Sequence, residues 1–236
     1  MLLLNRSCLI SELPEAQMAF ADPPDNISLG YDSYHDKLTN DEYEEFIDDV
    51  ICIGTGAPTF WLSFNARHTA MVGYLVHSNF RHMEVKPCVN VFTFGNYQSR
   101  DLTNCYRPLW RFRRLNAPLY PEAIKVPSWR QLNGDKRAAE GGRVPGDVFE
   151  FPRVTGNSKQ RRAWHPTQLH EDLYERCIKL CCKPGDTVVD MFAGTGTLAR
   201  VADRCGINAI MIEKSRAYCE KIAEEHNLSE TDGVWT

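Results

Sequence analysis

The clearest structural signal in the chain is the stretch Val188-Val189-Asp190-Met191-Phe192-Ala193-Gly194-Thr195-Gly196-Thr197. Its apolar first half predicts a buried strand, its two glycines predict a tight turn, and the periodicity of residues 198–205 predicts a helix. A second apolar run, residues 209–212, then ends at Glu213. Strand, turn, helix and strand in this order predict a parallel sheet of the α/β class.

The turn in this stretch is suited to a ligand. Gly194 and Gly196 lack Cβ atoms, so a ligand can approach the backbone at the helix N-terminus. Glu213 follows about 20 residues later, where a carboxylate can accept both hydroxyls of a ribose. The turn is not G-x-G-x-x-G and has no P-loop lysine, which disfavours a diphosphate or triphosphate. A ribose without a diphosphate indicates S-adenosylmethionine (AdoMet); the alternative is an ordinary turn whose glycines bind nothing.

The alternation of helices and strands extends along most of the chain. Apolar residues recur at helical spacing in segments 43–51, 166–181, 198–205, 218–226 and, less clearly, 69–76. Short apolar runs, typical of strands buried on both faces of a parallel sheet, lie at 18–21, 59–64, 187–192 and 209–212. Segments 89–94 and 106–112 predict a further strand pair without an intervening helix. The sequence therefore predicts a mostly parallel sheet with an antiparallel edge.

The strand at 18–21 ends in Asp22-Pro23-Pro24-Asp25, at the edge of the sheet where open α/β folds bind ligands. Prolines lack N–H donors and hold the chain rigidly. The Asp22 carboxylate and the Pro23 carbonyl therefore remain as fixed, convergent acceptors. Together they suit an exocyclic amino group, because each can accept one of its two N–H bonds. The alternative interpretation is an ordinary Asp-Pro turn.

Charge is unevenly distributed along the chain. The whole chain has a net charge of −4, but residues 100–162 hold 14 Lys and Arg against 6 Asp and Glu, a local net charge of +8. Periodicity disappears in residues 115–162, which are rich in proline and glycine. We therefore divide the chain into a first half (1–114), an irregular basic insertion (115–162) and a cofactor half (163–236). A phosphate-facing surface and a solvated insertion without a partner both fit this charge.

Composition excludes several classes of protein. No window approaches the ~18 apolar residues that span a bilayer, and the N-terminus turns polar too early for the ~7-residue apolar core of a secretion signal. Nine cysteines show neither a paired Cys-x-x-Cys framework nor metal-ligand spacing. We expect reduced, mostly buried thiols, no metal, and a cytoplasmic protein.

Taken together, these motifs resemble the amino-methylating DNA methyltransferases. The resemblance rests on Asp-Pro-Pro after a strand, a later basic insertion, His165-Pro166-Thr167-Gln168 opening a helix, and Asp190-x-Phe192-x-Gly194-x-Gly196. Their order, with the catalytic motif first and the cofactor motif last, is similar to the permuted β class, and the likeness covers most of the chain. It implies a Rossmann-like, circularly permuted sheet of seven strands, in which the first few residues form a strand beside the C-terminal half.

The resemblance also implies roles for three groups of residues. Catalysis would rest on Asp22, Pro23, Pro24 and Asp25. AdoMet would be held by the glycine turn, the next strand end and the turn before the helix: Asp190, Phe192, Ala193, Gly194, Thr195, Gly196, Thr197, Glu213, His165, Thr167 and Gln168. The basic segment would bind DNA phosphates, and its irregular part, 115–162, would read the DNA sequence. The candidate phosphate contacts are Arg107, Arg111, Arg113, Arg114, Arg130, Lys136, Arg137, Arg153, Lys159, Arg161 and Arg162.

Two positions depart from the family pattern. The family has Tyr, Trp or Phe after Asp-Pro-Pro, and that ring stacks on the target base, whereas this chain has Asp25, which cannot stack. We hypothesise that Tyr31, Tyr34 or Trp61 supplies the ring; alternatively, Asp25 hydrogen-bonds the base or marks a lost activity. The family also often has Gly-Asp, which contacts the adenine of the cofactor, where this chain has Arg6-Ser7.

The activity implied by the resemblance is AdoMet-dependent methylation of an exocyclic amino group of a DNA base, adenine N6 before cytosine N4. The partner would be double-stranded DNA with its target base flipped out, which would place the protein at the nucleoid. A homodimer is a further expectation, because family members often pair. Methylation of RNA or another amine, and a non-catalytic protein that binds AdoMet or DNA, are the alternatives.

Overall fold

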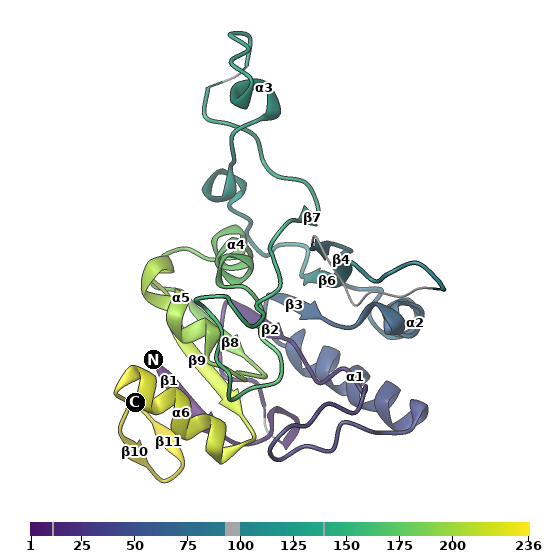
Figure 1. Ribbon diagram of the computed structural model, residues 1–236, viewed down its shortest axis with the longest axis vertical. Helices are drawn as coiled ribbons and strands as arrows, with labels where there is room; N and C mark the ends of the chain where they lie inside the picture. Colours follow the sequence, from purple (N-terminus) through teal and green to yellow (C-terminus); the bar gives the residue numbers. More distant parts are fainter. Residues whose placement is uncertain (11, 93–99, 139) are drawn as a thin grey trace.

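Five parallel strands form the centre of the protein in a computed structural model, which describes residues 1–236 except 11, 93–99 and 139 (Figure 1). Their spatial order is β1-β9-β8-β2-β3. The bounds are β1 Leu2–Asn5, β2 Met18–Ala21, β3 Thr59–Ser63, β8 Thr187–Asp190 and β9 Asn208–Glu213. The N-terminal strand β1 pairs with β9, so the two ends of the chain share one sheet, as expected.

Short strands extend the sheet at both edges. On one side β6 (Tyr106–Arg113) runs antiparallel to β3 and pairs with β4 (Glu84–Lys86) and β5 (Val89–Val91), beside which lies β7 (Val148–Phe149). On the other side a hairpin of β10 (Glu230–Thr231) and β11 (Val234–Trp235) pairs with β1. The antiparallel edge is confirmed. The described residues form eleven strands rather than seven, because β4, β7 of the insertion and the two strands of the C-terminal hairpin add pairings. The last residues expected in the 89–94 strand lie outside the described residues.

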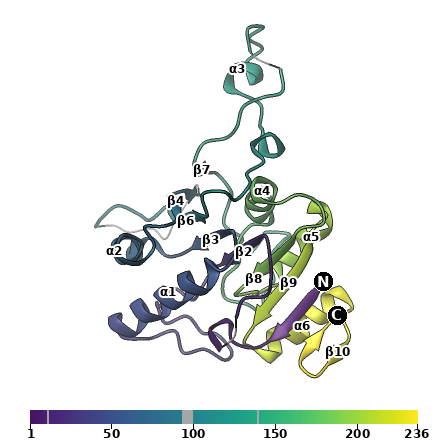
Figure 2. The ribbon, with the colours of Figure 1, turned by 180° about the vertical axis from the view of Figure 1, so that it is seen from behind.

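Helices cover both faces of the sheet (Figures 1 and 2). The α-helices are α1 Asn40–Gly54, α2 Thr69–Asn79, α3 Trp129–Leu132, α4 Glu171–Cys181, α5 Thr197–Cys205 and α6 Arg216–His226. Single 3₁₀ turns lie at Cys8–Ile10, Ala66–His68 and Pro121–Ile124. Of the helices in the described part of the chain, none is long and apolar enough to cross a membrane.

Strand β2 shows how the core is divided. Its alternate residues Met18 and Phe20 join the apolar cluster under α4, α5 and α6, whereas Ala19 and Ala21 join the cluster under α1 and α2. All four are fully buried, as the uninterrupted apolar run predicts. The described residues contain no disulfide bond: all nine cysteines are free, and seven are buried.

The helix expected from Pro166 begins only at Glu171. Residues 165–170 instead form an extended turn held by side chains. The Gln168 amide accepts from Arg162 N at 3.0 Å and donates to Gln160 O at 2.7 Å, while His170 caps the helix by accepting from Asp172 N at 3.3 Å. A motif expected to open a helix therefore lies free of it, where its side chains can face a ligand.

The insertion 115–162 has two parts. Its first part projects from the body as an arm, with α3 near the tip (Figures 1 and 2), and the two sides of the arm join where Val126 and Arg143 exchange backbone hydrogen bonds. Its second part returns to the body: β7 pairs with β5, and Phe149 and Val154 are buried. The returning part leads directly to the 165–170 turn.

Candidate active site

A cavity at the carboxyl ends of the parallel strands brings the two sequence motifs together. Asp22, after β2, and Gly194, after β8, line the same cavity. This follows from the pairing of β2 with β8, in which Phe20 lies opposite Asp190. Of the residues predicted to bind AdoMet, those that line this first cavity are His165, Thr167, Gln168, Phe192, Ala193, Gly194, Thr195, Thr197 and Glu213. Arg6 and Ser7, at the family's Gly-Asp position, also line it.

Glu213 holds the glycine loop at the floor of the first cavity. Its Oε2 accepts from Gly194 N at 2.9 Å and its Oε1 from Ser215 N at 2.8 Å. Burial raises the pKa of the Glu213 carboxyl, while these backbone N–H groups oppose the shift. Gly194 and Gly196 have φ of +51° and +72°, a conformation that favours glycine. Gly196 caps α5 without lining the cavity.

Asp190 lies behind the wall of the cavity. It is completely buried; its Oδ1 accepts from Phe192 N at 3.1 Å and its Oδ2 from the Tyr174 hydroxyl at 3.0 Å. Burial raises the pKa of the Asp190 carboxyl to about 7. Asp190 therefore does not line the first cavity, and its carboxylate instead holds the loop that carries Phe192.

His165 is a neutral, packed side chain at the edge of the first cavity. Its Nδ1 donates to the Thr167 carbonyl at 2.6 Å, and burial lowers the pKa of its imidazole to about 4. The ring lies against Gly194, where an added Cβ would be 3.2 Å from Nε2. The ring also makes an edge-to-face contact with the ring of Tyr218, with 4.7 Å between the centroids. His165 therefore fixes the glycine loop against the 165–170 turn.

The segment 26–38 forms a strap along the same cavity. Asp36 ties its first turn by accepting from the backbone N–H groups of Asn26, Ile27 and Leu29 at 2.7–3.1 Å. Its middle is joined to the cofactor half, because Ser215 Oγ donates to Asp32 Oδ2 at 2.6 Å. The strap carries Tyr31 and Tyr34, the two tyrosines that we hypothesised to stack on the target base.

Tyr31 and Tyr34 line the first cavity, but Trp61 does not. Trp61 is 1% exposed, lies in the core cluster, and donates from Nε1 to Cys181 Sγ at 3.4 Å. The hypothesis that Trp61 stacks on a base is therefore wrong, since it occupies an inward position of the buried strand β3. Tyr31 also lines a second cavity, which Tyr34 does not reach.

The second cavity adjoins the first. Both are lined by Asp22, Tyr31, Thr167, Gln168 and Leu169. Pro23 and Asp25 line the second cavity only, whereas Pro24 lines the first. Other residues of its wall include Asn65, Asn90, Phe92, Tyr106, Arg107, Arg153 and Arg161. Asp22 thus stands at the boundary of two neighbouring chambers.

Arg107 holds both acidic residues of the Asp-Pro-Pro-Asp turn. Its Nη2 lies 2.6 Å from Asp22 Oδ1 and 2.9 Å from Asp25 Oδ1, and its Nη1 lies 3.0 Å from Asp25 Oδ2. Its Nε donates to Ser63 Oγ at 2.7 Å. The side chains of Arg107, Asp22 and Asp25 are 19%, 17% and 10% exposed. Sequence reasoning did not single out this contact, because it depends on the antiparallel register of β6 with β3.

The basic segment 100–162 is partly neutralised by acids outside it. Ion pairs join Arg107 to Asp22 and Asp25, Arg111 and Arg113 to Glu84, and Arg162 to Glu225. The prediction that Arg107, Arg111, Arg113 and Arg162 face phosphate is therefore not supported, because carboxylates hold their guanidinium groups. Arg153 and Arg161 line the second cavity, Arg153 lying 5.5 Å from the Phe92 ring centroid, and Lys159 is exposed.

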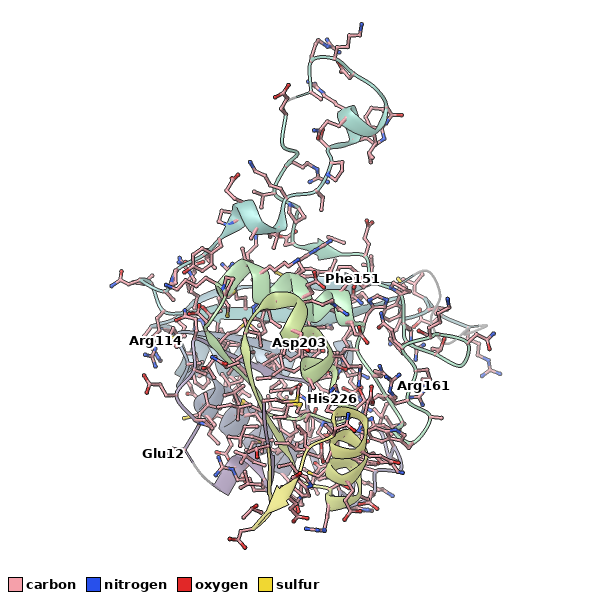
Figure 3. The ribbon with its side chains drawn as sticks, turned by 90° about the vertical axis from the view of Figure 1, so that its left-hand side faces the viewer. Glu12, Arg114, Phe151, Arg161, Asp203 and His226 are labelled. Carbon is pink, nitrogen blue, oxygen red and sulfur yellow. The ribbon has the colours of Figure 1, made fainter. Side chains whose placement is uncertain are left out.

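The second cavity and a third cavity lie at opposite ends of the parallel strands. In Figure 3, Arg161 lies at one side of the body, and Glu12 and Arg114 lie at the other. Glu12 and Arg114 line a third cavity, at the amino ends of the parallel strands. The basic residues of the second cavity thus share the carboxyl edge with Asp22.

Comparisons with known proteins agree with this geometry. A family model described as DNA methylase matches residues 16–225. The chain is 26% identical over 224 residues to the Type II methyltransferase M.HpaI of Haemophilus parainfluenzae, covering 92% of this chain and 69% of the relative. It is 42% identical over 76 residues to the DNA adenine methyltransferase YhdJ of Escherichia coli K12, covering 32% of this chain and 26% of that protein.

A solved structure shares the fold. The structure described as the PvuII DNA methyltransferase, cytosine-N4-specific, superposes with a TM-score of 0.64 at 16% identity, covering 91% of this chain and 81% of that one. The relatives and this structure thus include one protein named for adenine and one named for cytosine N4.

Proposed function

The chain belongs to the family of N6- and N4-specific DNA methylases. From that premise we propose that it methylates an exocyclic amino group of a DNA base, with adenine N6 preferred over cytosine N4. The observation that carries the proposal is the position of Asp22 on the wall between the two cavities. One cavity would hold AdoMet and the other the target base. The motif order, catalytic turn first and glycine loop last, supports the permuted β class.

The first cavity fits AdoMet. Its wall combines the Glu213 carboxylate, suited to ribose hydroxyls, with apolar surface from Phe192, Met191 and Ile212, suited to an adenine ring. Gly194 lets the loop pack closely against the His165 ring, because a Cβ at this position would approach that ring. When bound, AdoMet supplies an electrophilic methyl group on a sulfonium.

Asp22 and Pro23 would orient the amine of the target base. Arg107 engages only Oδ1 of Asp22, which leaves Oδ2 as an acceptor. In the turn, the Pro24 carbonyl accepts from the Tyr43 hydroxyl at 2.9 Å and the Asp25 carbonyl contacts His68 Nε2 at 2.9 Å. Among the described residues none bonds to the Pro23 carbonyl. That carbonyl and Asp22 Oδ2 thus remain for the two N–H bonds.

These two acceptors address the chemical difficulty of the reaction. The lone pair of an amino group on adenine or cytosine is delocalised into the ring, which makes the nitrogen a poor nucleophile. Hydrogen bonds to the two acceptors favour a pyramidal nitrogen and stabilise the positive charge that develops on it. The Asp22 carboxylate then lies close to the proton that the nitrogen loses. No covalent bond between enzyme and base is required.

The second cavity would receive the flipped base. Flipping costs a few kcal/mol, which contacts in the pocket offset. Tyr31 offers an aromatic ring at the boundary of the two cavities, and we propose it as the stacking partner that Asp25 cannot be. Arg153, Lys159 and Arg161 would contact phosphates of double-stranded DNA, and the projecting arm would contribute to the choice of sequence.

The test is transfer of labelled methyl groups from AdoMet to unmodified DNA by the purified protein, followed by identification of the base. Wild type is expected to label adenine N6, and Asp22→Asn, which removes the anionic acceptor, to lower the rate at least about 100-fold. Sequencing of methylated bases in cells that express the two forms identifies the site. Label at cytosine N4 would change the base assignment, and absence of label in DNA of varied sequence would refute the proposal.

A further inference from the structure

The acidic residue that replaces the family's aromatic ring has a defined partner in this structure. Asp25 forms a bidentate ion pair with Arg107, with N–O distances of 2.9 and 3.0 Å. The same guanidinium contacts Asp22 Oδ1 at 2.6 Å. We propose that Arg107 is a positioning residue for Asp22, and that Asp25 serves to position Arg107. This inference rests on the proposed function, because it assigns the two residues a part in the same reaction.

Three parts of the chain meet at the guanidinium. Arg107 is the second residue of β6, Ser63 ends β3, and Asp22 and Asp25 occupy the turn after β2. Nε bonds to Ser63 Oγ, Nη1 to Asp25, and Nη2 to both carboxylates. A planar guanidinium held along three edges has little freedom to rotate. Arg107 therefore fixes Oδ1 of Asp22, and with it the direction in which Oδ2 points.

Charge supports the same assignment. Burial raises the pKa of the Asp22 carboxyl; the Arg107 charge opposes that shift and the Asp25 charge adds to it. The other titratable groups whose charge couples to Asp22 are Asp190 of β8, Tyr174 of α4 and Tyr31 of the strap. Arg107 is the cation bonded to Asp22 among the described residues, so its charge favours the ionised form of the acceptor against the effect of burial.

An aromatic ring at position 25 would be incompatible with this arrangement. Asp25 is 7% exposed, and its side chain also lies 3.4 Å from the Asn65 amide. Replacing it with tyrosine would remove both oxygens that hold Nη1 and Nη2, leaving a buried cation with one carboxylate. The structure therefore predicts that Asp25→Tyr, which restores the family residue, lowers activity. If Asp25 were only the result of losing the aromatic ring, Asp25→Tyr would raise activity.

The experiment compares Arg107→Gln, Arg107→Lys, Asp25→Asn and Asp25→Tyr. Arg113→Gln is the matched control, because Arg113 lies on the same strand and loses a comparable partner, Glu84, away from both cavities. Arg107→Gln is expected to lower kcat about 100-fold, with Arg107→Lys intermediate, since a lysine cannot bond bidentately. The effect should be larger on kcat than on the KM for DNA, and the Kd for AdoMet should stay within about threefold, because neither Arg107 nor Asp25 lines the first cavity.

A second readout does not require activity. Carboxyl-carbon NMR of labelled protein, with Asp22→Asn for assignment, should show the pKa of Asp22 rising in Arg107→Gln and falling in Asp25→Asn. The acid limb of the kcat profile should move in the same directions. Unmoved Asp22 titration, a KM effect without a kcat effect, or an Asp25→Tyr variant more active than wild type would each overturn the assignment. If wild type fails to methylate DNA, the proposed function fails, while the titration still tests the positioning.

Discussion

Asp22 and Gly194 line one cavity because the strands that precede them, β2 and β8, are paired neighbours at the centre of the sheet. One motif supplies an acceptor for an amine and the other a loop that a cofactor can approach. Their meeting depends on the parallel direction of both strands, which places both loops at the carboxyl edge. The predictions below test the parts of this edge separately.

Glu213→Gln is expected to weaken AdoMet binding about tenfold. The carboxylate accepts from Gly194 N and Ser215 N and still has lone pairs for a ribose, whereas an amide has a single oxygen to accept with. Loss of one charge-assisted hydrogen bond, about 1.5–3 kcal/mol, corresponds to roughly tenfold or more in Kd. Calorimetric titration measures it. Glu220→Gln, exposed on α6, is the control, and equal affinity in the two variants would contradict the assignment of Glu213.

Asp190→Asn is expected to change how stability depends on pH. With a folded pKa of about 7, above that of an unfolded carboxyl, Asp190 loses stabilisation as the pH rises from about 4 to 7. An asparagine can keep the Phe192 N–H and Tyr174 contacts without that penalty. The free energy of unfolding should shift in favour of the variant by about 1.4 kcal/mol per pH unit over this range and level off above it.

Denaturant unfolding at pH 5, 6, 7 and 8 provides the measurement, and Asp203→Asn, on the exposed side of α5, is the control. A constant difference between Asp190→Asn and wild type across this range would show that Asp190 is ionised in the folded protein. The AdoMet affinity of the variant should change little, because the carboxylate does not line the cavity.

The sequence predicted the parts of the fold that depend on local pattern. Helix α1 covers the segment 43–51 in which apolar residues recur at helical spacing, and the buried strands lie where apolar runs predict them. The turn at 165–170 was not predicted as such, because Gln168 and His170 bond to distant backbone and to the helix end rather than continuing the periodicity.

Side-chain partners across the sheet were the least predictable. Apolar periodicity does not distinguish a Trp61 that faces the core from one that faces a ligand, since β3 is buried throughout. Likewise, local charge counts did not reveal that Arg107 pairs with Asp22 and Asp25, because the pairing depends on the register between β3 and β6. Both outcomes follow from tertiary contacts between segments distant in the chain.

Gly196→Ala is expected to destabilise the fold by about 2–3 kcal/mol. Gly196 has φ of +72°, and an added Cβ would lie 3.1 Å from the Ile222 side chain of α6. Gly134→Ala is the control, because Gly134 has nearly the same φ, +71°, but no atom within 4 Å of the added Cβ. It should lose about 1 kcal/mol or less. Denaturant unfolding measures both, and equal losses would show that crowding against Ile222 is unimportant.

Tyr31→Ala is expected to raise the KM for DNA about tenfold, while Tyr31→Phe stays near wild type. Stacking between an aromatic ring and a base is worth about 1–3 kcal/mol, and phenylalanine keeps the ring. Trp61→Phe separates stacking from packing: it should lower the melting temperature, because the buried indole contacts Cys181, without changing the KM. Steady-state methylation of an oligonucleotide duplex measures the KM of all three variants, and thermal unfolding measures the melting temperature. If Tyr31→Ala binds DNA as wild type does while Tyr34→Ala does not, the stacking ring is Tyr34, and the base lies further into the first cavity.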